Sequence, residues 1–97
     1  MDHDLKSKLE QEQDQLPWKE LVRHFAFGRL FIVDSKVDLV DAAIAVAKDD
    51  ATSIKHWMDS GQFSTPSEEQ ASEWGDNPEI LFTINIVSPF VLAQKSI

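Results

Sequence analysis

The segment from Asp38 to Lys48 most limits what this chain can fold into. Between Leu39 and Ala47 only Asp41 is polar, and the segment contains neither Gly nor Pro, so it favours a helix. Asp38 and Asp41 have the spacing of an N-cap residue and an acidic N3 residue. A helix that is apolar on nearly every face is stable only when it is buried. We therefore predict that this segment forms the central helix of the hydrophobic core.

Length and composition predict one small domain. The chain has 97 residues, which suffice for a single modest core. It contains no cysteine, which excludes disulfide bonds, thiolate metal sites and cysteine nucleophiles. The N-terminus lacks the basic-then-apolar profile of a signal peptide, and no apolar run approaches the roughly 20 residues of a membrane-spanning helix. We expect a soluble, cytoplasmic protein that does not associate with membranes.

The negative charge is concentrated in the second part of the chain. The net charge of the whole chain is −8, of which residues 1–37 contribute −1 and residues 38–97 contribute −7. A field of this sign repels phosphate groups and favours either solubility or a basic protein partner. We therefore expect no nucleic-acid partner.

The first 16 residues differ in composition from the remainder. Residues 2–16 have Leu5, Leu9 and Leu16 as their only large apolar side chains. We predict a polar arm over residues 1–16, either a frayed or partner-dependent helix or a disordered segment. Residues 17–97 are expected to form a single compact α+β domain.

Apolar periodicity and turn residues predict the elements of that domain. The last helix has the best-defined start, with Thr65 as N-cap, Pro66 at N1 and Glu68 at N3. Together these patterns predict three to four helices packed on a small antiparallel sheet. The predicted helices run from Pro17 to Gly28, Leu39 to Ala47, Ala51 to Gly61 and Pro66 to Trp74, and the sheet comprises residues 29–34 and 80–94.

The two central helices are also similar to a helix-turn-helix followed by the start of a wing. In that arrangement Lys55 and His56 lie on the exposed face of the recognition helix, but Asp59 lies among them. Asp49 and Asp50 place negative charge at the helix N-terminus, where a phosphate group would otherwise bind. Because DNA binding needs several cations facing phosphates, charge disfavours this alternative, a winged-helix-like nucleic-acid-binding protein.

No residue pattern predicts a catalytic, cofactor-binding or metal site. The three histidines lack metal-ligand spacing, and the three glycines are isolated rather than grouped in a phosphate-binding loop. His24 is expected to be a partly buried histidine beside the apolar face of its helix. We therefore expect a protein that is not an enzyme and has no cofactor. Four aspartates are expected to cap helices: Asp38, Asp41, Asp49 and Asp50.

Several apolar residues predict protein–protein contact. A domain this small rarely buries three tryptophans completely. The apolar segment 80–93 is expected to lie at an open edge of the sheet, where residues 1–16 or a second copy of the chain can cover it. We expect a homodimer or an unidentified protein partner. The candidate interaction residues are Trp18, Lys55, His56, Trp74, Phe90 and Leu92.

Six short fragments occur in an order and spacing typical of one protein family. They are Pro17-Trp18-Lys19-Glu20-Leu21, His24-Phe25-Ala26-Phe27-Gly28, Asp38-Leu39-Val40, Asp49-Asp50-Ala51, Trp57-Met58-Asp59-Ser60-Gly61 and Val87-Ser88-Pro89-Phe90-Val91-Leu92-Ala93-Gln94. On these fragments residues 16–95 resemble the small bacterial proteins of the domain-of-unknown-function family 2288. The resemblance implies no particular activity, cofactor or partner. The residues themselves favour a non-catalytic protein-interaction or regulatory module.

Overall fold

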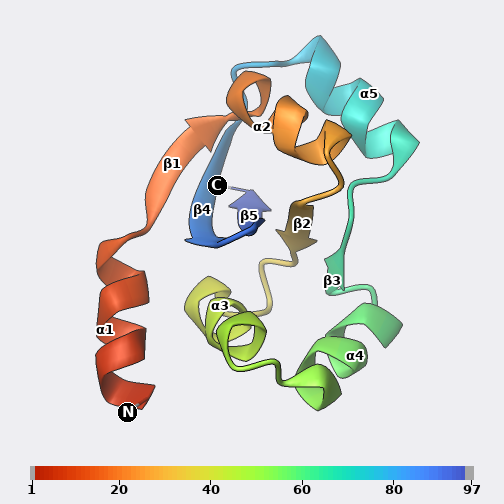
Figure 1. Cartoon of the computed structure of the whole chain (residues 1–97). Coiled ribbons are helices and arrows are strands. Elements are labelled where there is room, and N and C mark those ends of the chain that lie inside the picture. The colour runs from red at the N-terminus through yellow and green to blue at the C-terminus, as the bar shows by residue number, and fades with distance from the viewer. Residues whose placement is uncertain (1, 96–97) are drawn as a thin grey trace.

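The computed structural model describes residues 2–95, in which five helices and five strands follow one another along the chain (Figure 1). The α+β class predicted from the sequence is confirmed. The predicted number of helices is too low, because residues 2–11 are helical as well. The elements are α1 (Asp2–Gln11), β1 (Asp14–Pro17), α2 (Trp18–Ala26), β2 (Leu30–Val33), α3 (Leu39–Ala47), α4 (Ala51–Asp59), β3 (Phe63–Ser64), α5 (Glu68–Asp76), β4 (Leu81–Val87) and β5 (Phe90–Lys95).

The strands form one mixed sheet in the order β1-β4-β5-β2-β3. Neighbouring strands run antiparallel except β2 and β5, which run parallel with Leu30 opposite Val91 and Ile32 opposite Ala93. The prediction of an antiparallel sheet is therefore wrong for this central pair. Alternating apolar residues locate a strand, but they do not specify the direction of the strand beside it.

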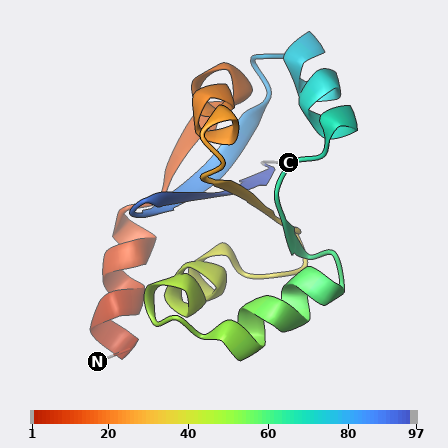
Figure 2. The ribbon, with the colours of Figure 1, turned by 45° about the vertical axis from the view of Figure 1, so that its right-hand side comes forward.

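Helices cover both faces of the sheet (Figure 2). Helices α2 and α5 lie on one face, and α1, α3 and α4 lie on the other. Each face has its own hydrophobic core. The tryptophan core, beneath α2 and α5, contains Trp18, Leu21, Leu30, Trp74, Phe82, Ile84, Val91 and Ala93. The central-helix core, beneath α1, α3 and α4, contains Leu9, Val33, Val37, Leu39, Val40, Ala42, Ala43, Phe63 and Leu92.

Helix α3 is the buried central helix that the sequence predicts. The Asp38 carboxylate caps its start by accepting hydrogen bonds from the backbone N–H groups of Val40 (2.8 Å) and Asp41 (3.2 Å). Ala42 and Ala43 are fully buried, and their small side chains allow the sheet to approach the helix backbone closely. The buried positions of α3 are Leu39, Val40, Ala42, Ala43 and Ala45.

The N-terminal residues join both the helical layer and the sheet. Helix α1 packs beside α3, and its Leu9 side chain is only 4% exposed. Strand β1 then pairs with β4, with Leu16 opposite Phe82. Over residues 5–16 the segment that we expected to be a polar arm therefore contributes a core residue and an edge strand.

Helix α5 begins later than predicted. Its N-cap is Ser67 rather than Thr65, and Gln70 rather than Glu68 is the N3 residue. The Ser67 hydroxyl accepts from the Gln70 backbone N–H (3.1 Å), while the Gln70 side chain accepts from the Ser67 N–H (3.0 Å). This reciprocal capping box satisfies two backbone donors, which is why it determines where the helix starts.

Candidate functional site

Three of the six predicted interaction residues belong to the hydrophobic cores. Trp18 is 2% exposed, Trp74 is 6% exposed and Leu92 is completely buried. The rings of Trp18 and Trp74 lie 5.1 Å apart, and both contact the ring of Phe82. The structure therefore corrects the sequence hypothesis for these three side chains, since a residue buried in the core presents no surface to a partner.

Lys55 and His56 are exposed on α4, but the outward face of that helix is not basic. The Lys55 ammonium forms an ion pair with the Asp59 carboxylate at 3.0 Å. At the start of α4, the hydroxyl and backbone N–H groups of Ser53 donate hydrogen bonds to the Asp50 carboxylate. These bonds hold the pKa of Asp50 below its usual value of 3.8. The end of α4 that would approach a phosphate group therefore carries a stably ionised carboxylate.

The apolar C-terminal segment does not lie at an edge of the sheet, so that expectation was wrong. Strands β4 and β5 are internal, because β1 pairs with the outer side of β4 and β2 pairs with β5. The edges are instead β1 and β3, which are short. The sequence signal for β1 was weak, because only Leu16 among its first three residues is apolar.

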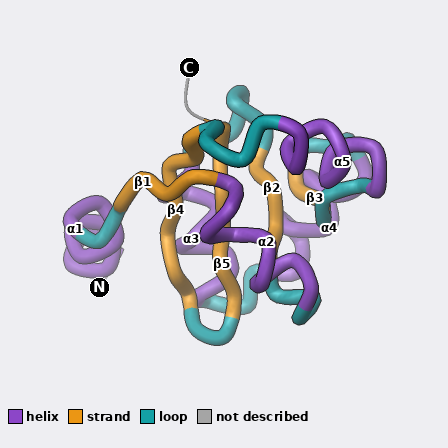
Figure 3. The backbone as a smooth tube through the Cα atoms, turned by 90° about the horizontal axis from the view of Figure 1, so that it is seen from above, coloured by secondary structure: helices purple, strands orange, loops and turns teal. Residues whose placement is uncertain are grey.

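The two most exposed large apolar side chains of the described residues lie at one end of the sheet. Phe27 is 70% exposed and Ile86 is 58% exposed. Figure 3 shows the α2–β2 connection and the β4–β5 hairpin turn at the same end of the molecule. Val91 links them, since it lies opposite Ile86 in the hairpin and its N–H donates to the carbonyl oxygen of Arg29 at 2.9 Å.

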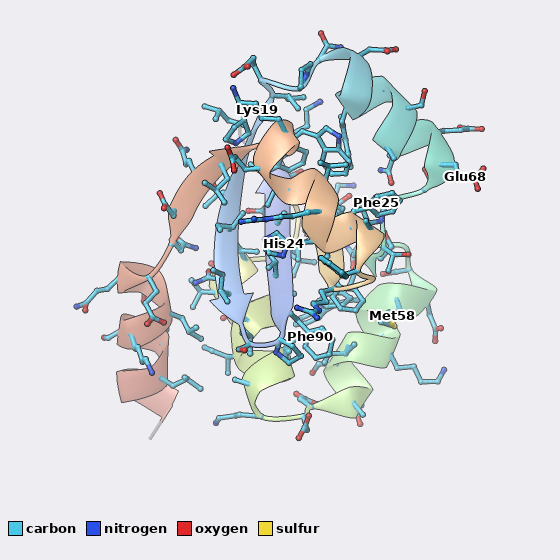
Figure 4. The ribbon with its side chains drawn as sticks, turned by 45° about the horizontal axis from the view of Figure 1, so that its top comes forward. Lys19, His24, Phe25, Met58, Glu68 and Phe90 are labelled. Atoms are coloured by element: carbon cyan, nitrogen blue, oxygen red, sulfur yellow. The ribbon has the colours of Figure 1, made fainter. Side chains whose placement is uncertain are left out.

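Charge and aromatic contacts complete this surface. The Arg29 guanidinium carbon lies 5.1 Å from the centre of the Phe27 ring, a cation–π geometry. On the opposite sheet face Phe90 is half-buried, and its ring meets the Phe31 ring edge-on at 5.5 Å. Figure 4 shows Phe90 at the hairpin end, well away from Glu68 at the start of α5. We define the hairpin-end surface as Phe27, Arg29, Ile86, Pro89 and Phe90.

A pocket lies at the other end of the sheet, where the parallel strands β2 and β5 terminate. Its volume is about 380 Å³, and we refer to it as the carboxyl-end pocket. The carboxyl-end pocket is lined by Ile32, Val33, Asp34, Ser35, Gln70, Trp74 and Lys95.

A second, more polar groove of about 480 Å³ separates α1 from the loop before α3 and includes Lys6, Glu10 and Gln13.

Over residues 5–95, whose side chains the structure describes, no group of three or more His, Cys, Asp or Glu side chains is arranged to hold a metal ion. His24 is partly buried on α2, as predicted (Figure 4). In the same part of the chain, none of the helices has the length and apolarity required to span a membrane.

These features define a small α+β protein with a mixed sheet between two layers of helices. The chain belongs to the family described as "Protein of unknown function (DUF2288)", whose model matches residues 4–95. A comparison with curated proteins finds no match. The chain is also similar to PA1075 from Pseudomonas aeruginosa, solved in solution by NMR: 32% of residues are identical, the TM-score is 0.82, and the match covers 97% of this chain and 86% of that one.

Proposed function

We propose that this protein is a non-catalytic interaction module that self-associates through the hairpin-end surface. The observation that carries the proposal is the exposure of Phe27 and Ile86, at 70% and 58%, beside a cationic Arg29. Aromatic and arginine side chains are enriched in protein interfaces and supply much of their binding energy. Exposed apolar side chains that gather at one place mark an interaction site more often than scattered ones do.

The charge distribution is compatible with a second copy of the chain as the partner. Two molecules of net charge −8 repel each other unless their acidic surfaces remain apart. Helix α5 carries Glu68, Glu69, Glu73 and Asp76 without a basic residue, and it lies on the flank of the molecule rather than at the hairpin end. A two-fold contact through the hairpin ends therefore keeps the two acidic helices away from the interface while burying Phe27 and Ile86.

The test measures molar mass as a function of concentration. Light scattering and sedimentation equilibrium should show a mass that rises from about 11 kDa toward twice that value as the concentration reaches the high micromolar range. The double substitution Phe27→Ser and Ile86→Ser should weaken the dimer at least about tenfold, because each removes buried apolar area from the interface. A constant monomer mass at every concentration would reject self-association.

Leu81→Ser is the matched control. Leu81 lies at the opposite end of β4 from Ile86 and is itself 44% exposed, so the substitution removes a similar apolar side chain outside the hairpin-end surface. The control should leave the dimerisation constant unchanged. If Leu81→Ser weakens the dimer as much as the double substitution does, the interface lies elsewhere.

A further inference from the structure

The carboxyl-end pocket combines an apolar floor with two opposite charges. Ile32 and Trp74 supply the apolar surface, and both belong to or pack on the tryptophan core. Ile32 and Ala93 are register partners on the neighbouring parallel strands β2 and β5, so the residues that follow them lie at the same end of the sheet. Asp34 is the first residue after β2 and Lys95 is the last residue of β5, and both line the pocket.

The location is one at which open sheets commonly bind ligands. In open α/β sheets ligands bind outside the carboxyl ends of parallel strands, and this pocket has the same place relative to β2 and β5, the one parallel pair of this mixed sheet. The volume of about 380 Å³ falls within the range of about 300–1,000 Å³ typical of small-molecule sites. The pocket is therefore suited to a small molecule rather than to a polymer.

The polar groups that line the pocket retain bonding capacity. Asp34 uses Oδ1 to accept the Lys36 N–H at 2.8 Å, which leaves Oδ2 for a cation. Gln70 uses Oε1 in the capping box, which leaves its amide N–H groups as donors. Among the described residues, no hydrogen bond or ion pair to the Lys95 ammonium is present, so this cation is suited to a carboxylate.

We propose that the carboxyl-end pocket binds a free amino acid with an apolar side chain. Lys95 and the Gln70 amide bind its carboxylate, Asp34 binds its ammonium group, and Ile32 and Trp74 contact its side chain. The pair of opposite charges selects a zwitterion. A simple anion is repelled by Asp34 and a simple cation is repelled by Lys95, and either one leaves one charge of the pocket without a partner. This site lies at the end of the sheet opposite the hairpin-end surface, so its proposal stands or falls independently of self-association.

The direct test is an NMR titration of the full chain with three related compounds. L-leucine carries both charges, 4-methylpentanoate lacks the ammonium group, and 3-methylbutylamine lacks the carboxylate. L-leucine should shift the backbone resonances of residues 32–35, Gln70 and Lys95 and the Trp74 indole signal. Each single-charge analogue should bind at least about tenfold more weakly, as expected when one charge-assisted hydrogen bond is lost.

Substitutions at the two charges separate the pocket from adventitious binding. Asp34→Asn and Lys95→Met should each weaken L-leucine binding about tenfold or more. Lys55→Met, on exposed α4, is the matched control and should leave binding unchanged. The absence of localised shifts at about 50 mM L-leucine, or equal binding of L-leucine and 4-methylpentanoate, would overturn the proposal. Thermal unfolding of each variant shows whether it is folded, and Asp34→Asn preserves the oxygen that accepts the Lys36 N–H.

Discussion

Asn85 is the single residue that most directly attaches α1 to the sheet. Its side chain is completely buried in β4. Its amide nitrogen donates to the backbone carbonyl oxygen of Leu9 at 2.7 Å, and its oxygen accepts from the Gln13 amide at 3.2 Å. The hydrogen-bonding groups of this buried amide are thus matched by two residues that are 76 and 72 positions away in the sequence.

Asn85→Asp tests this attachment with almost no change in volume. At pH 7 the substitution replaces the donor to Leu9 with a buried carboxylate that faces a carbonyl oxygen, which should cost about 3 kcal/mol or more in unfolding free energy. Burial disfavours the charged form, so the introduced carboxyl should have a higher pKa in the folded than in the unfolded state. The loss should therefore be largest at high pH and shrink as the pH falls, because the protonated acid regains a donor.

Urea unfolding at pH 7 and at about pH 4 measures both effects. Asn77→Asp provides the control, since Asn77 is exposed at the C-cap of α5. This substitution should lower the free energy of unfolding by no more than about 1 kcal/mol. Equal losses at positions 77 and 85 would show that Asn85 does not hold α1 in place.

Burial of Asn85 and exposure of Ile86 were both unpredictable from the local pattern. The alternation in β4 predicts that Ile80, Phe82, Ile84 and Ile86 face the core. Phe82 and Ile84 do so, with exposures of 0% and 3%, but Ile86 extends beyond the cover of α2 and is 58% exposed. Alternation assigns side chains to a face, whereas burial depends on where the covering helix ends. The hairpin-end surface therefore could not be located from the sequence.

At the scale of elements, the sequence predicts those whose signals are local. Helix α3 was predicted correctly because its capping residue and apolar run lie within a few positions of each other. For α1 the sequence predicts either a frayed or partner-dependent helix or a disordered segment, and it does not predict strand β1, because both elements depend on contacts with α3 and β4 formed across the whole chain. The parallel pairing of β2 with β5 could not be predicted for the same reason, because the two strands are far apart in the sequence. The carboxyl-end pocket, which depends on this pairing, could not be predicted either.

Ala43→Asp tests the central position of α3. Ala43 is completely buried, so the substitution places an unpaired charge in the central-helix core and should cost several kcal/mol. A domain of this size has only about 5–15 kcal/mol of total stability, so the variant should be largely unfolded by circular dichroism. Ala47→Asp is the control, since Ala47 is exposed near the end of the same helix and should lose about 1 kcal/mol or less. If Ala43→Asp melts within a degree or two of the unsubstituted protein, α3 is not the core.

At the scale of the whole molecule, the two ends of the sheet differ in chemistry. The hairpin end presents apolar side chains and Arg29, while the carboxyl end presents a pocket between opposite charges. The sheet separates these regions, and the parallel strands β2 and β5 run from one to the other. If both proposals hold, a partner at the hairpin end and a ligand at the carboxyl end would not obstruct each other.

The charge distribution predicts that the protein does not bind DNA with useful affinity. Residues 38–97 carry a net charge of −7, and this part of the chain contains both helices that resemble a helix-turn-helix. Helix α2, which precedes this pair in the sequence, lies on the opposite face of the sheet and belongs to the other core (Figure 2). Lys55 is already paired with Asp59.

Fluorescence anisotropy with duplex DNA at physiological salt should accordingly give a dissociation constant no tighter than about 10 μM, which is ordinary non-specific binding. Lys55→Ala should not change that value, because a side chain that makes no phosphate contact contributes nothing to the salt-dependent affinity. Asp49→Lys combined with Asp59→Lys tests the opposite direction. It replaces one carboxylate just before α4 and one at its last residue, and should strengthen binding at low salt if negative charge is what prevents it. Submicromolar, salt-sensitive binding by the unsubstituted protein, lost in Lys55→Ala, would show instead that α4 is a recognition helix.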